Sequence, residues 1–150
     1  MDPSATGLAG VGCVIRNSNG DLLGGESRIN VRSAPIEAEA EAVLSGLHLA
    51  KEQGHHDVVL ECDSQVVVQS LRDRKRAIPW KIYPFIQAIR RLVSWFSSIH
   101  WTWIPRTANK AAHVAATIAN LRVRHLRWAS QPPPSLVLVL SRDGLPGPPY

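Results

Sequence analysis

Two carboxylates in this chain stand at positions where an acidic side chain is unusual. Glu39 falls on the apolar stripe of a predicted helix, and Asp63 follows a predicted buried strand. Inward-facing carboxylates need a compensating positive charge, because an unpaired buried charge is costly. Carboxylate oxygens are also the ligands that hard divalent cations prefer. The two residues therefore predict a shared divalent metal site.

The helix that carries Glu39 is predicted for residues 33–53, with Ser33 as N-cap and Pro35 in the first turn. At about 3.6 residues per turn, one face is apolar and the opposite face is polar. The apolar stripe consists of Ile36, Ala40, Val43, Leu47 and Ala50, and the water-facing side of Glu37, Glu41, Ser45, His48 and Glu52. Glu39 falls on the inward side, with Val43, Gly46 and Ala50. The alternative is an acid that favours the helix N-terminus through the helix dipole.

Asp63 follows a short apolar run, residues 57–62, which is bounded by polar residues and comes after Gly54, a helix stop. A helix followed by a buried strand is typical of a helix-covered sheet. Asp63 lies at the carboxyl end of this strand, where open α/β sheets place their ligand crevice. A second helix is expected from Gln65 to Leu71, directly after Ser64. The alternative for Asp63 is therefore that it caps this helix.

The remaining pattern predicts an α/β fold, a mixed sheet flanked by helices. Residues 7–17 and 21–31 form a hairpin around the turn sequence Asn17–Gly20. An amphipathic helix is predicted for 80–96, an alternating strand for 99–104 and an Ala-rich helix for 107–121. Residues 1–121 are expected to form one domain. Residues 122–150 are expected to form a basic, Pro- and Gly-rich tail that is loosely ordered.

The chain of 150 residues has a net charge of +5, and its basic residues cluster. The clusters favour a polyanionic partner, most simply nucleic acid, although each one alone is also consistent with ordinary solvated charge. The two cysteines, Cys13 and Cys62, form no disulfide framework, which predicts an intracellular protein. The N-terminus has no apolar signal segment, and the apolar run at 136–140 is too short to span a membrane, so no membrane partner is expected.

An ordered set of motifs resembles a known family. The motifs are Gly10–Arg16 (GVGCVIR), the turn Asn17–Gly20, Ala38–Ala40, Gly46–Leu47, Glu61–Ser64 and Pro105–Asn109, followed by a PPPSL and DGLPGPP tail. Together they are similar to a type 1 ribonuclease H domain, of the plant reverse-transcriptase-like branch derived from retroelements. The similarity covers nearly the whole chain, and the order of the motifs carries it.

This resemblance implies a five-stranded mixed sheet of order 3-2-1-4-5 and cleavage of the RNA strand of an RNA–DNA hybrid by two magnesium ions. Glu39 matches the family's helix glutamate, and Asp63 its strand-end aspartate. His113 stands where catalytic members have an aspartate, with a solvated helix histidine as the alternative. In the family, the first aspartate lies on the first, central strand, just upstream of where this chain begins, and Asp2 is interpreted as a loop residue. We therefore expect the first central strand to be missing, and the chain to be truncated or its sheet rearranged.

The resemblance makes Glu39, Asp63 and His113 the expected catalytic and metal-binding residues. Two carboxylates and a neutral imidazole offset less charge than four carboxylates, so we expect one weakly bound Mg2+ or Mn2+. The expected nucleic-acid contacts are Arg72, Arg74, Lys75, Arg76, Arg90, Arg91, Arg106 and Asn109. Three functions follow as hypotheses: a hybrid-specific ribonuclease, a catalytically impaired nucleic-acid binder, and a retroelement remnant with a role in protein interaction.

Overall fold

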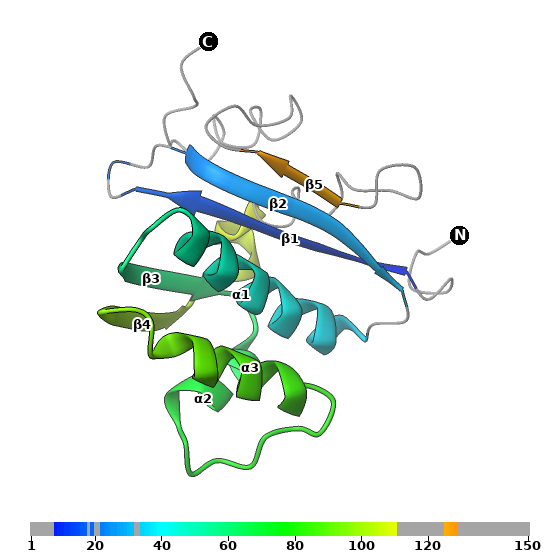
Figure 1. Ribbon diagram of the computed structural model, residues 1–150. Coiled ribbons are helices and arrows are strands. Elements are labelled where there is room, and N and C mark those ends of the chain that lie inside the picture. Colours follow the sequence, from blue (N-terminus) through cyan, green and yellow to red (C-terminus); the bar gives the residue numbers. More distant parts are fainter. Residues whose placement is uncertain (1–7, 18, 20–21, 32–33, 111–124, 129–150) are drawn as a thin grey trace. The chain divides into compact units, whose positions relative to one another are not determined.

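The computed structural model describes residues 8–17, 19, 22–31, 34–110 and 125–128 (Figure 1). The chain divides into two compact units. One contains residues Met1–Arg32 and Lys110–Tyr150, and the other contains Ser33–Asn109. The described strands form two sheets, a three-stranded sheet of order β1-β2-β5 and a two-stranded sheet of order β3-β4. The architecture is mixed α/β, as predicted.

The first unit contains the predicted hairpin. Strands β1 (Leu8–Arg16) and β2 (Leu22–Val31) pair in antiparallel register from Leu8↔Val31 to Arg16↔Leu22, with an irregularity between Ile15 and Arg16. The backbone N–H of Asn19 donates to Oδ1 of Asn17 at 3.0 Å, which closes the turn locally. The turn residues thus act as the sequence pattern indicated.

A short third strand, β5 (His125–Trp128), pairs antiparallel with β2 and lies within the range for which the sequence predicted no element. Its register places Trp128 opposite Gly25. A Cβ atom at Gly25 would overlap the Trp128 indole ring. The glycine therefore allows β5 to lie close to β2, whereas any larger residue would require the Trp128 ring to move.

The second unit holds three helices and the parallel pair of strands (Figure 1). Its elements are α1 (Pro35–Glu52), β3 (Asp57–Cys62), α2 (Gln65–Arg72), α3 (Tyr83–Val93), β4 (Ser98–Trp103) and a 3-10 turn, η2 (Arg106–Ala108). Strands β3 and β4 pair in register from Asp57↔Ser98 to Cys62↔Trp103. The core of this unit consists of Ala40, Val43, Leu47, Leu49, Ala50, Cys62, Val67, Val68, Leu71, Ile82, Ile86, Ile89 and Phe96.

The predicted apolar stripe of helix α1 is largely buried, but the N-cap of the helix and the face opposite the stripe differ from the prediction. Its N-cap is Ala34, which is extended (φ −67°, ψ 155°) and makes no side-chain cap, so the prediction of Ser33 as the cap is wrong. The following proline at the first helical position forces this extended conformation on Ala34. Ser45, predicted to face water, is buried together with Leu49. Helix α1 is therefore covered on two sides rather than one.

The two-stranded sheet differs from the single five-stranded sheet that the resemblance implied. The described strands form two sheets, one of three strands and one of two. Strand β3 was predicted to be buried, but Asp57, Val59 and Glu61 are exposed, and only Cys62 is fully buried. Because side chains alternate along a strand, only the face opposite these three residues is covered.

Helix α3 begins at Tyr83, three residues later than the predicted start at Trp80, and ends at Val93 rather than Phe96. The later start of the helix has a local cause. The N–H of Ile82 donates to the carbonyl of Pro79 at 3.1 Å, which closes a turn around residues 80 and 81 before the helix starts. The predicted helix over 107–121 lies mostly outside the described residues.

Candidate functional site

Glu39 lies five residues into α1 and is half-buried. The acid in the first turn of the helix is Glu37. Since the helix dipole acts mainly on the terminal turn, the dipole explanation fits Glu37 better than Glu39. The position of Glu39 therefore calls for another explanation.

Asp63 directly follows β3 and is half-buried. The N-cap of α2 is Ser64, whose Oγ accepts the N–H of Val67 at 3.3 Å, so the alternative that Asp63 caps the helix is wrong. The backbone carbonyl of Asp63 accepts the indole N–H of Trp103 at 3.0 Å. This bond, together with the β3–β4 register, fixes the backbone of Asp63 at the carboxyl end of the sheet.

The buried thiol of Cys62 lies within electrostatic reach of both carboxylates. Its side chain is 6% exposed, and its Sγ accepts the N–H of Ser64 at 3.5 Å. Burial raises the pKa of the Cys62 thiol to about 11; the bond from Ser64 opposes this rise, and the carboxylates of Glu39 and Asp63 add to it. Glu39 from α1 and Asp63 from the end of β3 thus both lie close enough to one sulfur atom to repel its thiolate. Both predicted site residues therefore act electrostatically on the same thiol.

The donors at this site fit a hard cation better than a soft one. Both carboxylates offer oxygen atoms, whereas a thiol with a pKa near 11 stays protonated at neutral pH and is a poor ligand. Across the described part of the chain, no group of three or more His, Cys, Asp or Glu side chains could hold a metal ion. His113 lies outside the described residues. Glu39 and Asp63 would leave most of the coordination of one ion to water or to a phosphate ligand.

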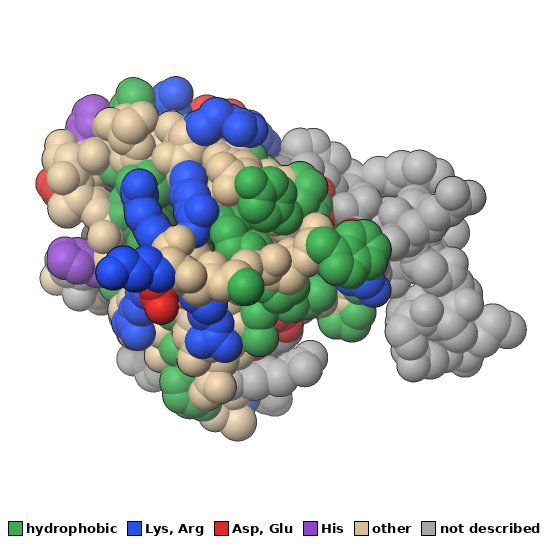
Figure 2. All heavy atoms as spheres, turned by 90° about the horizontal axis from the view of Figure 1, so that it is seen from below, with side chains coloured by type: hydrophobic (Ala, Val, Ile, Leu, Met, Phe, Trp, Pro, Cys, Tyr) green, Lys and Arg blue, Asp and Glu red, His purple; other side chains and the backbone are tan. Residues whose placement is uncertain are grey.

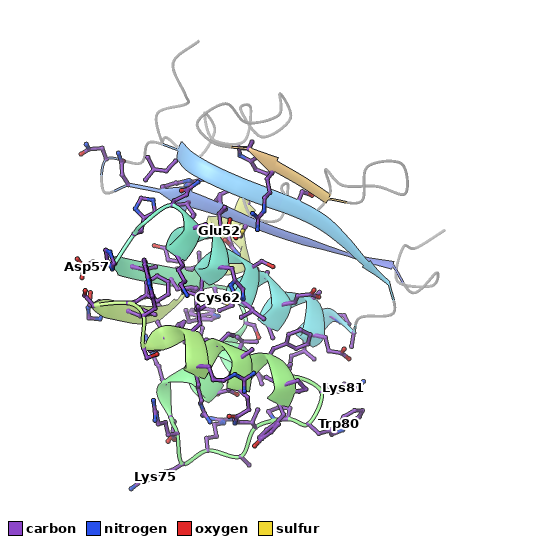
Figure 3. All side chains as sticks on the ribbon, viewed as in Figure 1. Glu52, Asp57, Cys62, Lys75, Trp80 and Lys81 are labelled. Carbon is purple, nitrogen blue, oxygen red and sulfur yellow. The ribbon has the colours of Figure 1, made fainter. Side chains whose placement is uncertain are left out.

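The predicted nucleic-acid contacts divide into two groups. Arg72 donates from Nε (2.9 Å) and Nη2 to the carbonyl of Trp101, and Arg90 donates from Nη2 to the carbonyl of Ser70 at 3.2 Å. These two guanidinium groups help to hold the unit together. For Arg74, Lys75, Arg76 and Arg91, which are exposed, no side-chain hydrogen bond of this kind is described, and Figure 3 shows Lys75 at the outer end of the loop between α2 and α3. Arg106 belongs to η2, and Asn109 is half-buried just after it.

Cys62 and Trp103 have roles at the site that the sequence pattern did not indicate. Cys62 is a buried core residue, and the charges of Glu39 and Asp63 also act on its thiol. Trp103 was placed in a strand without a role, yet it anchors the backbone of Asp63. The register Cys62↔Trp103 places the two residues side by side at one end of the sheet. The predicted strands 57–62 and 99–104, aligned at their ends, would have paired Cys62 with Ile104, one residue from its observed partner.

The chain matches the family model described as reverse transcriptase-like over residues 3–119. It is similar to the crystal structure of RNase H1 from the halophilic archaeon Halobacterium salinarum NRC-1, with 26% identity, a TM-score of 0.69, and coverage of 73% of this chain and 83% of that one. It also resembles the N-terminal RNase H domain of Rv2228c from Mycobacterium tuberculosis, with 21% identity, a TM-score of 0.57, and coverage of 73% and 93%. This second likeness shows the fold alone. No curated protein matches the chain. Among the described helices, none is long and apolar enough to cross a membrane.

Proposed function

Because the chain belongs to the reverse transcriptase-like family, we propose that it binds RNA–DNA hybrid and hydrolyses phosphodiester bonds of the RNA strand with the help of a divalent metal ion. The observation that supports this proposal is that Glu39 and Asp63, one from α1 and one from the end of β3, both raise the pKa of the buried Cys62 thiol. The similar protein from Halobacterium salinarum is an RNase H1, and that likeness supports the same class of reaction.

In the proposed mechanism, Glu39 and Asp63 would hold the ion, with His113 as a further ligand. A bound divalent ion supplies positive charge that favours hydroxide formation from water and stabilises the phosphodiester oxygens. The chain's own residues set the geometry. Trp103 donates to the Asp63 carbonyl, and Ser64, the next residue, caps α2, so the backbone that carries the Asp63 carboxylate is held in place. Cys62, buried and neutral, provides an uncharged neighbour that does not compete for the ion.

A second candidate function is a nucleic-acid binder that has lost catalysis. It is favoured by the charge of the site, because the described residues supply two carboxylates and no group of three or more metal-binding side chains. Exposed Arg74, Lys75, Arg76 and Arg91 would serve binding equally well with or without catalysis. The two functions therefore differ only in what happens to a bound hybrid.

The decisive experiment compares wild-type protein with Asp63→Asn on a labelled RNA–DNA hybrid in Mg2+ or Mn2+. Glu61→Gln is the matched control, because Glu61 lies two residues away on the exposed face of the same strand. We expect cleavage by wild type and Glu61→Gln and none by Asp63→Asn. A hybrid that all three proteins bind equally and none cuts would establish the binder instead. Cleavage that persists in Asp63→Asn would refute the assigned site.

A further inference from the structure

Two exposed aromatic rings, one in the loop between α2 and α3 and one at the start of α3, lie in strongly basic surroundings. Trp80 is 81% exposed, and Tyr83, the first residue of α3, is 51% exposed. Residues 72–91 contain seven Lys and Arg residues and one acid, Asp73. Figure 3 shows Trp80 and Lys81 projecting outward from this loop. A tryptophan so fully exposed gains nothing from burial in the folded chain, which points to a partner.

The backbone that presents Trp80 is held in place. The N–H of Ile82 donates to the carbonyl of Pro79 at 3.1 Å, and the N–H of Ile86 donates to the carbonyl of Ile82 at 2.9 Å. The side chain of Ile82 is fully buried. A turn thus connects Pro79 to the buried Ile82, and Trp80 and Lys81 are its two exposed central residues. The indole ring is therefore presented from an ordered backbone rather than from a loose loop.

The charges around Trp80 indicate what its partner is. Nζ of Lys81 lies 5.7 Å from the centre of the Trp80 ring. Arg74, Lys75 and Arg76 are exposed, and Figure 2 shows Lys and Arg side chains beside hydrophobic ones on this face. The single acid of the stretch, Asp73, accepts the backbone N–H of Lys75 at 3.0 Å and so serves the loop itself. A basic surface with accessible ring faces suits a polyanion that has exposed ring faces of its own.

Among polyanions, single-stranded nucleic acid meets this description best. Bases within a duplex stack on one another, so their faces are not available to a protein ring, whereas unpaired bases stack readily on aromatic side chains. We propose that Trp80 and Tyr83 form a stacking platform for unpaired nucleotides, with Lys81 and the cluster Arg74–Arg76 contacting their phosphates. The inference goes beyond the proposed function, because it assigns a second ligand, a single-stranded segment, to a surface that needs neither Glu39 nor Asp63.

The test measures binding by fluorescence anisotropy in EDTA, so that nothing is cut. The ligands are a blunt RNA–DNA hybrid, the same hybrid with a single-stranded overhang, the overhang strand alone, and a hybrid whose overhang lacks its bases. Wild type should bind the hybrid with a base-bearing overhang about ten-fold more tightly than the blunt or abasic hybrid, because stacking of one base on an aromatic ring raises the affinity by a factor of about ten. Trp80→Ala should abolish this difference, and Trp80→Phe should keep most of it.

Two controls separate stacking from other effects. Val59→Ala removes another exposed apolar side chain, on β3, and should leave every affinity unchanged. The melting temperature of Trp80→Ala should equal that of wild type, because the ring is mostly exposed.

Equal binding of base-bearing and abasic overhangs by wild type would overturn the proposal. So would a wild-type dimer that Trp80→Ala dissociates, because the surface would then serve self-association. Binding of the single strand without binding of the blunt hybrid would support the platform while refuting the proposed hybrid substrate.

Discussion

Titration of the Cys62 thiol is a direct test of whether Glu39 and Asp63 form one site. Burial raises the pKa of this thiol from 9.0 to about 11, with the two carboxylates as smaller contributors in the same direction. The whole rise corresponds to about 3 kcal/mol in favour of the neutral thiol. Because burial is the largest cause, most of the rise should survive removal of a carboxylate. Each carboxylate is a smaller contributor than burial.

We therefore expect Glu39→Gln and Asp63→Asn each to lower the pKa of Cys62 by a fraction of the whole rise, and the double variant to lower it further. A divalent ion held by the two carboxylates would offset their charge, so saturating Mg2+ should lower the pKa in wild type and leave it unchanged in the double variant. Glu61→Gln, which alters an exposed acid on β3, should have no effect.

The assay is the rate of alkylation of Cys62 as a function of pH, measured in a Cys13→Ala background because Cys13 is the second cysteine of the chain. The rate follows the thiolate fraction, so its midpoint reports the pKa. A midpoint that is the same in wild type and in both single variants would refute the convergence of the carboxylates on Sγ. If the pKa of Cys62 falls in the variants but does not respond to Mg2+ in wild type, the two carboxylates lie near Sγ as described, and the metal site is refuted.

Two further predictions concern stability and binding. Because the pKa of the Cys62 thiol is raised in the folded state, its contribution to stability is fully present below about pH 9 and is lost as the pH rises to about 11. Denaturant unfolding should therefore show that the free energy of unfolding falls by about 3 kcal/mol over this range in wild type and that this fall is absent from the Cys62→Ala variant. Arg72→Ala, which removes bonds to the carbonyl of Trp101, should lower the melting temperature, whereas Lys75→Ala should leave it unchanged and reduce the salt dependence of hybrid binding. The reverse pattern would show that Arg72 contacts phosphate and that Lys75 supports the fold.

The sequence predicted the elements of the candidate site because their patterns are local. The stripe of Ala40, Val43, Leu47 and Ala50 is buried as the helical spacing required, and it fixes the direction in which the rest of α1 points. The strand before Asp63 begins and ends at the predicted residues. A period of about 3.6 in a helix and a polar boundary after a strand are properties of the chain itself. Placing both acids therefore needed no knowledge of distant contacts.

Features that depend on distant contacts could not be predicted. Strand β5 has four residues, and its pairing with β2 relies on the space that Gly25 leaves for the Trp128 ring, about a hundred residues away in sequence. Arg72 looked like one more basic residue of a loop, and only the fold places the carbonyl of Trp101 within its reach. Trp80 had the spacing of the following helix, but the turn from Pro79 to Ile82 starts that helix later and leaves the ring outside.

The charge of the site determines how nucleic acid and metal would depend on each other. Glu39 and Asp63 carry two negative charges, and the protonated Cys62 adds none, so one divalent ion neutralises the described site. A second ion would bring positive charge that only a substrate phosphate or residues beyond the described part could offset. Metal and hybrid should therefore bind cooperatively, and by linkage each would tighten the binding of the other by the same factor. A site built on two carboxylates thus favours an ion that is held mainly while a phosphodiester lies against Glu39 and Asp63.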